Sequence, residues 1–352
     1  MNRFAFGLII LIVGWVSACQ GQMNIRSSTG TNALANRSFQ RAANTWGSEF
    51  HDNITIFLDF GFVTLDQRTV SAATYVRDSF TYSEFRNAIS NDVSTADDVK
   101  FSNGLAKGSS FSIYTNQTSE APVSNFELGY LDHDGGLNKT TVSLTTANAK
   151  ALGLRDSHAS TVDGVINFNA LYDCDFDPSD GIEANHLDFF GTALHEIGHT
   201  LGFSSGVDEL DNNGGGQFSD DELNYVNSLD FLRFSTDSEA VGADLDWTAD
   251  ERDKYLSIDG GLTNTAGVAS AWSKGVNYGD GEQASHWAIE GGFGIMDPTT
   301  DFGVRNELSN MDLLALDAIG YDRIFSAVPE PGSMLGWLAL AFYFRRYRRI
   351  KA

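Results

Sequence analysis

The sequence predicts an α+β fold that forms one large domain or two smaller ones. Segments with helical spacing of apolar residues and segments that alternate like strands are mixed along the chain, without a regular βαβ repeat. The 352 residues are 42% hydrophobic and 20% charged, a composition that allows a large core and argues against a disordered chain.

The N-terminal half of the chain contains two predicted helices and two predicted strands. Ser38 fits an N-cap, and the apolar residues after it follow helical spacing: Phe39, Ala42, Ala43, Trp46 and Phe50. Alternation of apolar residues predicts strands over 54–60 and 164–168. A second helix is expected over 82–92, whereas residues 101–143 show only short strand-like pieces broken by Gly and Asn.

Two further helices are predicted in the C-terminal half. An amphipathic helix is indicated by apolar residues separated by three or four positions: Leu187, Phe190, Leu194, Ile197 and Leu201. A polar, glycine-rich loop over 211–221 follows it. The last helix is expected over about 311–319, with Ser309 as its N-cap, Asp312 three residues later and Gly320 at its end.

Acidic residues outnumber basic ones by 47 to 23, and the imbalance is largest in the middle of the chain. Six cations lie within the first three or last eight residues. Residues 19–327 therefore carry 17 cations against 46 anions, a net charge of about −29. A body this acidic repels phosphate backbones, so we expect no nucleic-acid partner.

The N-terminus has the features of an export signal. Residues 1–18 combine a charged start, an apolar stretch and small residues, as in a secretory signal peptide. Residues 16–19 fit a bacterial lipobox as well as ordinary cleavage after Ala18, so lipidation of Cys19 stays open. Residues 19–37 are polar and predict a flexible leader. Cys19 and Cys174 are the only cysteines, so no disulfide framework holds the fold.

The C-terminus, residues 328–352, combines Val-Pro-Glu-Pro-Gly, an apolar run up to Phe344 and a cluster of arginines. As a helix, the apolar run would be roughly 20 Å long, against a hydrocarbon core of roughly 30 Å. This arrangement resembles the PEP-CTERM sorting signal of Gram-negative bacteria. The resemblance implies a membrane-associated stage, processing by an exosortase-type enzyme, and a destination at the cell surface, outer membrane or extracellular matrix. A plain tail anchor is the alternative.

Residues 195–199 read His-Glu-Ile-Gly-His, an H-E-x-x-H motif on the predicted helix. At 100° per residue, His195 and His199 lie about 40° apart and one turn along the axis, so both imidazoles can bind one zinc ion. Glu196 lies beside them and can act as a general base on a water at the metal. With seven histidines in the chain, chance predicts the motif roughly 0.006 times. An ordinary helix with two surface histidines is the alternative.

The motif extends to H-E-x-x-H-x-x-G at Gly202, which resembles the metzincin metalloproteases. Most of that clan carries a third His or an Asp three residues later, where this chain has Ser205. His286 instead stands in Ser-His-Trp, ten residues before Met296 in Gly-Ile-Met-Asp-Pro, a segment that resembles a Met-turn. A late histidine followed by such a turn is similar to the leishmanolysin-like branch.

The resemblance implies a set of roles and a fold. His195, His199 and His286 would bind zinc, Glu196 would be the general base, and Met296 would lie beneath the metal. The fold would be metzincin-like, with a twisted mixed sheet and the active-site helix in an N-terminal catalytic subdomain over 38–204. A more irregular C-terminal catalytic subdomain would cover 205–327. The strand over 165–168 would be the sheet edge that pairs with an extended substrate.

Other residues can also contribute to a metal site. A carboxylate soon after the helix is the alternative third ligand, with four candidates: Asp208, Glu209, Asp221 and Glu222. Asp188, seven residues before His195, either orients a neighbouring group or adds a favourable charge at the helix N-terminus. The acidic loops 172–181 and 208–222 offer oxygen ligands for Ca²⁺, although neither has EF-hand spacing.

The sequence therefore predicts an exported zinc metalloendopeptidase that hydrolyses peptide or protein substrates. Zinc would polarise the scissile carbonyl while Glu196 takes a proton from water and passes it to the leaving amine. Two alternatives remain. One is a non-catalytic surface or matrix module in which a metal only stabilises the fold, and the other is zinc-dependent hydrolysis of something other than peptides.

Overall fold

The computed structural model describes residues 23–27, 32–121, 128–289 and 291–324. The expected signal peptide, Cys19 and the expected sorting signal lie outside these residues. Within the described part, no helix combines the length and the apolar character needed to cross a membrane.

The chain has a mixed α/β architecture, as the α+β expectation required. The helices are α1 Ala33–Glu49, α2 Tyr82–Asn91, α3 Ala96–Gly104, α4 Leu137–Thr140, α5 Thr146–Ala151, α6 Phe189–Leu201, α7 Val207–Asn212, the 3-10 helix η1 Ser228–Leu232, α8 Thr236–Val241 and α9 Asn310–Ala318. The strands are β1 Asn24–Ser27, β2 Thr55–Val63, β3 Ser71–Tyr75, β4 Arg77–Thr81, β5 Ile113–Thr115, β6 Tyr130–Asp132, β7 Thr141–Thr145, β8 Gly164–Asn169, β9 Cys174–Asp175, β10 Leu187–Asp188, β11 Arg233–Phe234, β12 Asp246–Trp247 and β13 Tyr255–Leu256. They form several small sheets.

The largest sheet has four strands in the order β1-β2-β8-β3. Strands β1, β2 and β8 are parallel, whereas β3 runs antiparallel to β8. Strand β8 therefore lies inside the sheet, and the expectation that residues 165–168 form its edge is wrong. That edge is β3, because the chain segment that leaves β2 returns antiparallel on the far side of β8.

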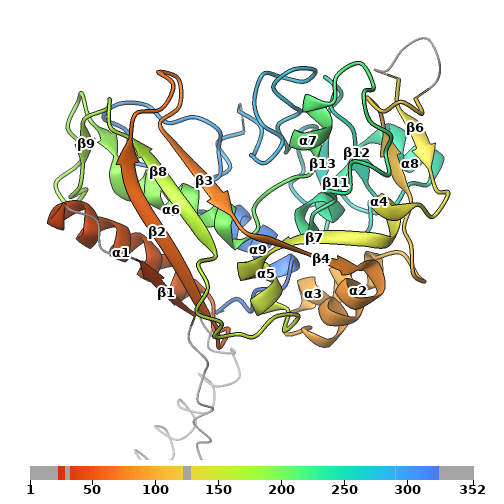
Figure 1. Ribbon diagram of the computed structural model, residues 1–352, viewed down its shortest axis with the longest axis horizontal. Coiled ribbons are helices and arrows are strands. Elements are labelled where there is room, and N and C mark those ends of the chain that lie inside the picture. Colours follow the sequence, from red (N-terminus) through yellow and green to blue (C-terminus); the bar gives the residue numbers. More distant parts are fainter. Residues whose placement is uncertain (1–22, 28–31, 122–127, 290, 325–352) are drawn as a thin grey trace, which may run out of the picture.

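Helices α1 and α6 pack against each other and against one face of this sheet (Figure 1). In β2, Ile56, Leu58 and Phe60 are buried and alternate with half-buried Phe57 and Asp59, as strand geometry requires. The buried face is rich in aromatic side chains that stack between the layers, for example the Phe39–Phe60 rings with centroids 4.3 Å apart. The sheet and α1 thus hold α6 in the interior.

The N-terminal boundary of the fold differs from the prediction. Helix α1 begins at Ala33, because the side chain of Asn32 accepts hydrogen bonds from the backbone N–H groups of Leu34 and Ala35. Ser38 is a buried residue inside the helix and is not its N-cap. Strand β1 also lies within the stretch expected to be a flexible leader, 19–37, where it pairs with β2.

The second half of the chain is irregular and connects short strands from distant segments. Strands β5 and β6 form a sheet with β12, so residues on both sides of position 205 share one sheet. Strands β4 and β7 form a separate two-stranded antiparallel sheet, and the backbone N–H of Ser143 in β7 donates to the carbonyl of Val226. Helix α9 starts at Asn310 after the Ser309 cap, with the expected capping box to Asp312. The proposed boundary between subdomains stays a prediction.

Candidate metal centre

Helix α6 carries the H-E-x-x-H motif through the centre of the molecule. Its N-cap is Asp188, which accepts hydrogen bonds from the backbone N–H groups of Gly191, at 3.0 Å, and Asn306, at 3.1 Å. Asp188 thus caps the helix and also binds the backbone of the loop that precedes α9, at Asn306. The helix ends at Gly202, whose φ of +117° lets the chain turn sharply away. Of the residues in α6, all but His195 are buried.

Three histidines converge at one point. The Nε2 atoms of His195 and His199 are 3.1 Å apart, and each lies 3.2 Å from Nε2 of His286. His199 and His286 are 9% and 7% exposed, and His195 is partly buried. The structure thus brings the late histidine, about 90 positions along the chain, to the two on α6. Among the described residues, these three are the only such group of His, Cys, Asp or Glu close enough to hold a metal ion.

The backbone fixes how each imidazole presents its nitrogens. The Nδ1 atoms of His195 and His199 lie 2.7 Å from the carbonyls of Ile295 and Phe203. Nδ1 of His286 lies 3.2 Å from the carbonyl of Gln283. Because a carbonyl only accepts, each Nδ1 carries the proton and donates, which leaves the Nε2 lone pair directed at the common centre.

Two of the three rings, those of His199 and His286, are held in the neutral form that binds metals. Burial, assisted by the neighbouring imidazoles, lowers the pKa of His199 to about 3 and that of His286 well below its usual value. With the protons on Nδ1, the Nε2 lone pairs face one another at hydrogen-bond distance and repel. A cation at the centre removes this repulsion, so the residues present fit a metal ion.

The loop that carries His286 is held by an acid after α6. The carboxylate of Asp208 accepts a hydrogen bond from the backbone N–H of Ala284, at 2.6 Å, and another from the Ser285 hydroxyl. The Ser285 oxygen in turn accepts from the N–H of Ser205, at 2.9 Å. Burial raises the pKa of Asp208 to about 6. Ser205, three residues after Gly202, thus supports the loop of the late histidine.

The alternative carboxylate ligands are used elsewhere. Asp208 is held by the His286 loop, and Glu209 is exposed on α7. Glu222 accepts from the backbone N–H of Ser219, and Asp221 lies beside the buried ammonium of Lys139. None of these four acids belongs to the group of close ligand atoms in the described part of the chain.

Met296 lies under α6 in a tight turn. Its side chain is buried, and a Cβ added to Gly198 would lie only 2.4 Å from its sulfur. Asp312 holds this turn, because its carboxylate accepts from the N–H groups of Ile295, at 2.9 Å, and Trp287 Nε1, at 2.8 Å. From the sequence, Asp312 was identified only as part of the α9 capping box. In the structure its carboxylate also connects the Met296 turn to Trp287, the residue after His286.

Glu196 is buried beside the histidines, with 4% of its surface exposed. Its Oε1 atom accepts a hydrogen bond of 2.6 Å from the hydroxyl of Ser71, the first residue of β3. Burial raises its pKa, whereas His195, the Ser71 hydroxyl and the backbone N–H of Ala73 favour the ionised form. Ser71 could not be identified from the sequence, because nothing local marks a serine that is 125 positions away from its partner.

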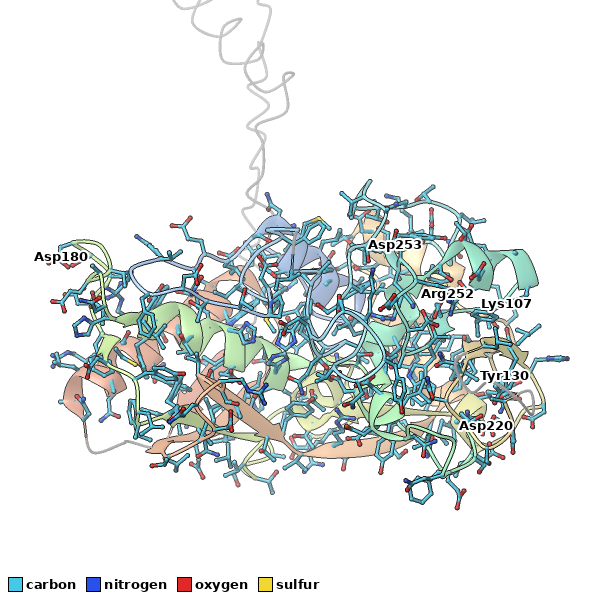
Figure 2. The ribbon with its side chains drawn as sticks, turned by 90° about the horizontal axis from the view of Figure 1, so that it is seen from above. Lys107, Tyr130, Asp180, Asp220, Arg252 and Asp253 are labelled. Atoms are coloured by element: carbon cyan, nitrogen blue, oxygen red, sulfur yellow. The ribbon has the colours of Figure 1, made fainter. Side chains whose placement is uncertain are left out.

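The two acidic loops considered for Ca²⁺ extend to distant parts of the molecule. Asp180 of the first loop and Asp220 of the second are at opposite ends of the molecule (Figure 2). Asp220, together with Asp132, is bonded to the ammonium of Lys139, so a side-chain cation already occupies the space between these carboxylates.

The chain matches no model of a known protein family, no curated protein and no solved structure. The residues of the centre are therefore the basis for a functional assignment.

Proposed function

We propose that this chain is an exported zinc-dependent endopeptidase of metzincin type. The observation that supports it is the triangle of Nε2 atoms, 3.1–3.2 Å on each side, with a buried glutamate adjacent to it in the helix. A site that only stabilises a fold has no need of a buried carboxylate at that position, and it would usually close its fourth ligand position.

Zinc is the metal that this donor set fits best. Tetrahedral coordination with Zn–N bonds of 2.0–2.1 Å separates the nitrogens by roughly 3.3–3.4 Å, close to the separations here. His195, His199 and His286 would hold the ion, and a three-histidine site that leaves a fourth position for water is typical of catalytic zinc.

Glu196 would move the proton during hydrolysis. Zinc, when bound, supplies a Lewis acid that polarises the scissile carbonyl and lowers the pKa of water. Glu196 takes a proton from the attacking water and donates it to the amine nitrogen as the carbon–nitrogen bond breaks. The reaction needs no covalent enzyme intermediate.

Strand β3 would align the substrate. It lies at the end of the strand order β1-β2-β8-β3, so its outer edge has no partner strand within the described residues. Ser71, in the same strand, contacts Glu196. A peptide that adds to this edge would hold its backbone beside the base through main-chain hydrogen bonds. The expected signal peptide and PEP-CTERM segment would deliver the enzyme to the cell surface, outer membrane or extracellular matrix.

Peptide cleavage by the purified, zinc-loaded protein tests the proposal. A mixed peptide library analysed by mass spectrometry would show new termini with the wild type, none after chelation of the metal, and none with Glu196→Ala. Glu209→Ala, an exposed acid away from the centre, is the matched control and would cleave like the wild type. Zinc-loaded wild type that cleaves no peptide would contradict the proposal and favour the non-catalytic surface module.

A further inference from the structure

The contact between β3 and the buried glutamate is asymmetric. The Ser71 hydroxyl lies 2.6 Å from Oε1 of Glu196. Oε2 is buried and makes no hydrogen bond of its own among the described residues, although the backbone N–H of Ala73, in the same strand, also interacts with this carboxylate. Buried carboxylate oxygens usually have partners, so an oxygen without one calls for an explanation.

The strand does not need this hydroxyl for its own position. Backbone pairing along the whole of β3 holds it against β8, with Ser71 opposite Phe168 and Tyr75 opposite Gly164. The Ser71 side chain is therefore not needed for strand pairing. Its hydroxyl instead donates to the carboxylate of Glu196.

We propose that Ser71 is a positioning residue for the general base, an inference that rests on the proposed peptidase function. Its hydroxyl holds Oε1 of Glu196 and leaves Oε2 as the atom that exchanges protons. Oε2 takes a proton from the attacking water as the water oxygen bonds to the carbonyl carbon. It gives that proton to the nitrogen as the carbon–nitrogen bond breaks, and it returns as a carboxylate.

The physical reason is the loss of rotational freedom. A glutamate side chain has three rotatable bonds, and one strong hydrogen bond to an ionised oxygen removes much of that freedom. A catalytic group held within a fraction of an ångström of its working position gains rate, and a displacement of about 1 Å can cost 100-fold. The same strand would align the substrate, so base and substrate share one rigid support.

Three serine variants of the full chain test this role. Ser71→Ala would lower kcat about 10- to 100-fold with little change in KM, since the base is displaced but the strand edge is intact. Ser71→Thr keeps a hydroxyl and would retain activity within about threefold of the wild type. Ser79→Ala, an exposed serine in β4, is the matched control and would leave both constants unchanged.

Two readouts do not depend on turnover. Zinc content would be the same in wild type and Ser71→Ala, because Ser71 contacts no histidine of the centre. Ser71→Ala would lower the melting temperature of the metal-free protein, but it would have no further effect in Glu196→Ala, where the bonding partner is already gone.

The outcomes separate this inference from the proposed function. If wild type cleaves peptides and Ser71→Ala has an unchanged kcat, the positioning role is wrong and the peptidase function stands. A raised KM with unchanged kcat, or a loss of zinc in Ser71→Ala, also overturns it. If zinc-loaded wild type cleaves nothing, both the function and the catalytic role of Ser71 fail, even where the melting temperatures show that the two side chains interact.

Discussion

At the residue scale, the metal centre depends on a histidine that the helix does not supply. Removing His286 leaves two imidazoles on α6, which is too few for a catalytic zinc site. We expect His286→Ala to weaken zinc binding by more than the 10- to 100-fold that loss of an outer-shell partner costs. Competition with a chelator of known affinity measures this. His133→Ala removes an exposed histidine and should bind zinc normally, whereas full zinc affinity in His286→Ala would remove His286 from the site.

Asp208 is predicted to support the metal through the loop of His286. Asp208→Asn keeps the shape of the side chain but loses one acceptor oxygen for the Ala284 N–H or the Ser285 hydroxyl. We expect zinc affinity to fall about 10- to 100-fold in a folded protein. Glu209→Gln, one residue along α7, should change nothing. Equal effects of the two substitutions on zinc affinity would contradict this role.

The sequence indicated those parts of the site that are close together in the chain or carry a distinctive residue type. The positions of His195, Glu196 and His199 follow from helix geometry alone. His286 and Met296 were suggested by their neighbours in the chain, and the structure brings both to α6. Ser71 and the supporting role of Asp208 could not be predicted, because serine and aspartate are common and these contacts depend on tertiary packing.

At the element scale, α6 requires a glycine between its two histidines. A Cβ at Gly198 would lie 2.4 Å from Sδ of Met296 and 3.4 Å from the ring of Trp46. An interior Gly→Ala change normally stabilises a helix by up to about 1 kcal/mol, but this clash should make Gly198→Ala destabilising by about 1–3 kcal/mol. Urea denaturation measures the free energy of unfolding.

A second substitution shows whether the sulfur causes the effect. In a Met296→Ala background the space is open, so Gly198→Ala should become neutral or stabilising. A Gly198→Ala effect of the same size and sign in both backgrounds would mean that the loss arises elsewhere in α6.

The helices and strands with strong local sequence signals lie where they were predicted. The order of the strands in the sheet differs from the prediction. Helices α2 and α9 and strands β2 and β8 lie where the periodicity and caps placed them. The start of α1 was misplaced because Asn32 and Ser38 are both good capping residues, and only packing decides between them. The sheet edge was assigned to β8 on the metzincin resemblance, and the assignment failed because strand order depends on contacts between distant segments.

At the scale of the whole molecule, several of the few basic side chains are buried. Among the described residues, four basic side chains are at most 2% exposed: Lys139, Lys150, Arg233 and Lys254. Three of them form ion pairs with aspartates, such as Lys150 with Asp163 at 2.7 Å. Buried acids are more numerous than these buried bases, so some carboxylates lie near one another.

One such group lies where α2, α3 and α9 meet the end of α1. Burial and the neighbouring acids raise the pKa of Asp92 to about 8 and that of Asp52 to about 7. Asp317 is raised to about 7, mainly by burial and by Asp98. Asp322 is a fifth acid of the group, and Arg323 and His51 are the nearby basic groups. Asp52, Asp92 and Asp317 therefore hold protons in the folded state at a pH where the unfolded chain has lost them.

This difference predicts a stability that falls as the pH rises. A raised folded pKa contributes stability at low pH, and that contribution is lost as the pH rises through the folded values of about 7 to 8. Exposed carboxylates are already ionised above pH 6.5 and do not contribute there. Between pH 6.5 and 8.5 we expect the melting temperature to fall by about 5 °C.

The contribution of this group to the pH dependence can be isolated by an isosteric substitution. Asp92→Asn removes the carboxyl with the highest pKa in the group and lowers the repulsion on Asp52, so the melting temperature should fall less between pH 6.5 and 8.5. The pKa of Glu120 is also raised to about 7 by its contact with Asp220, so part of the pH dependence of the melting temperature remains in Asp92→Asn. Asp66→Asn changes an exposed acid outside the group and should keep the wild-type slope. If Asp92→Asn and wild type lose stability equally, the pH dependence arises from other carboxyls of this acidic fold.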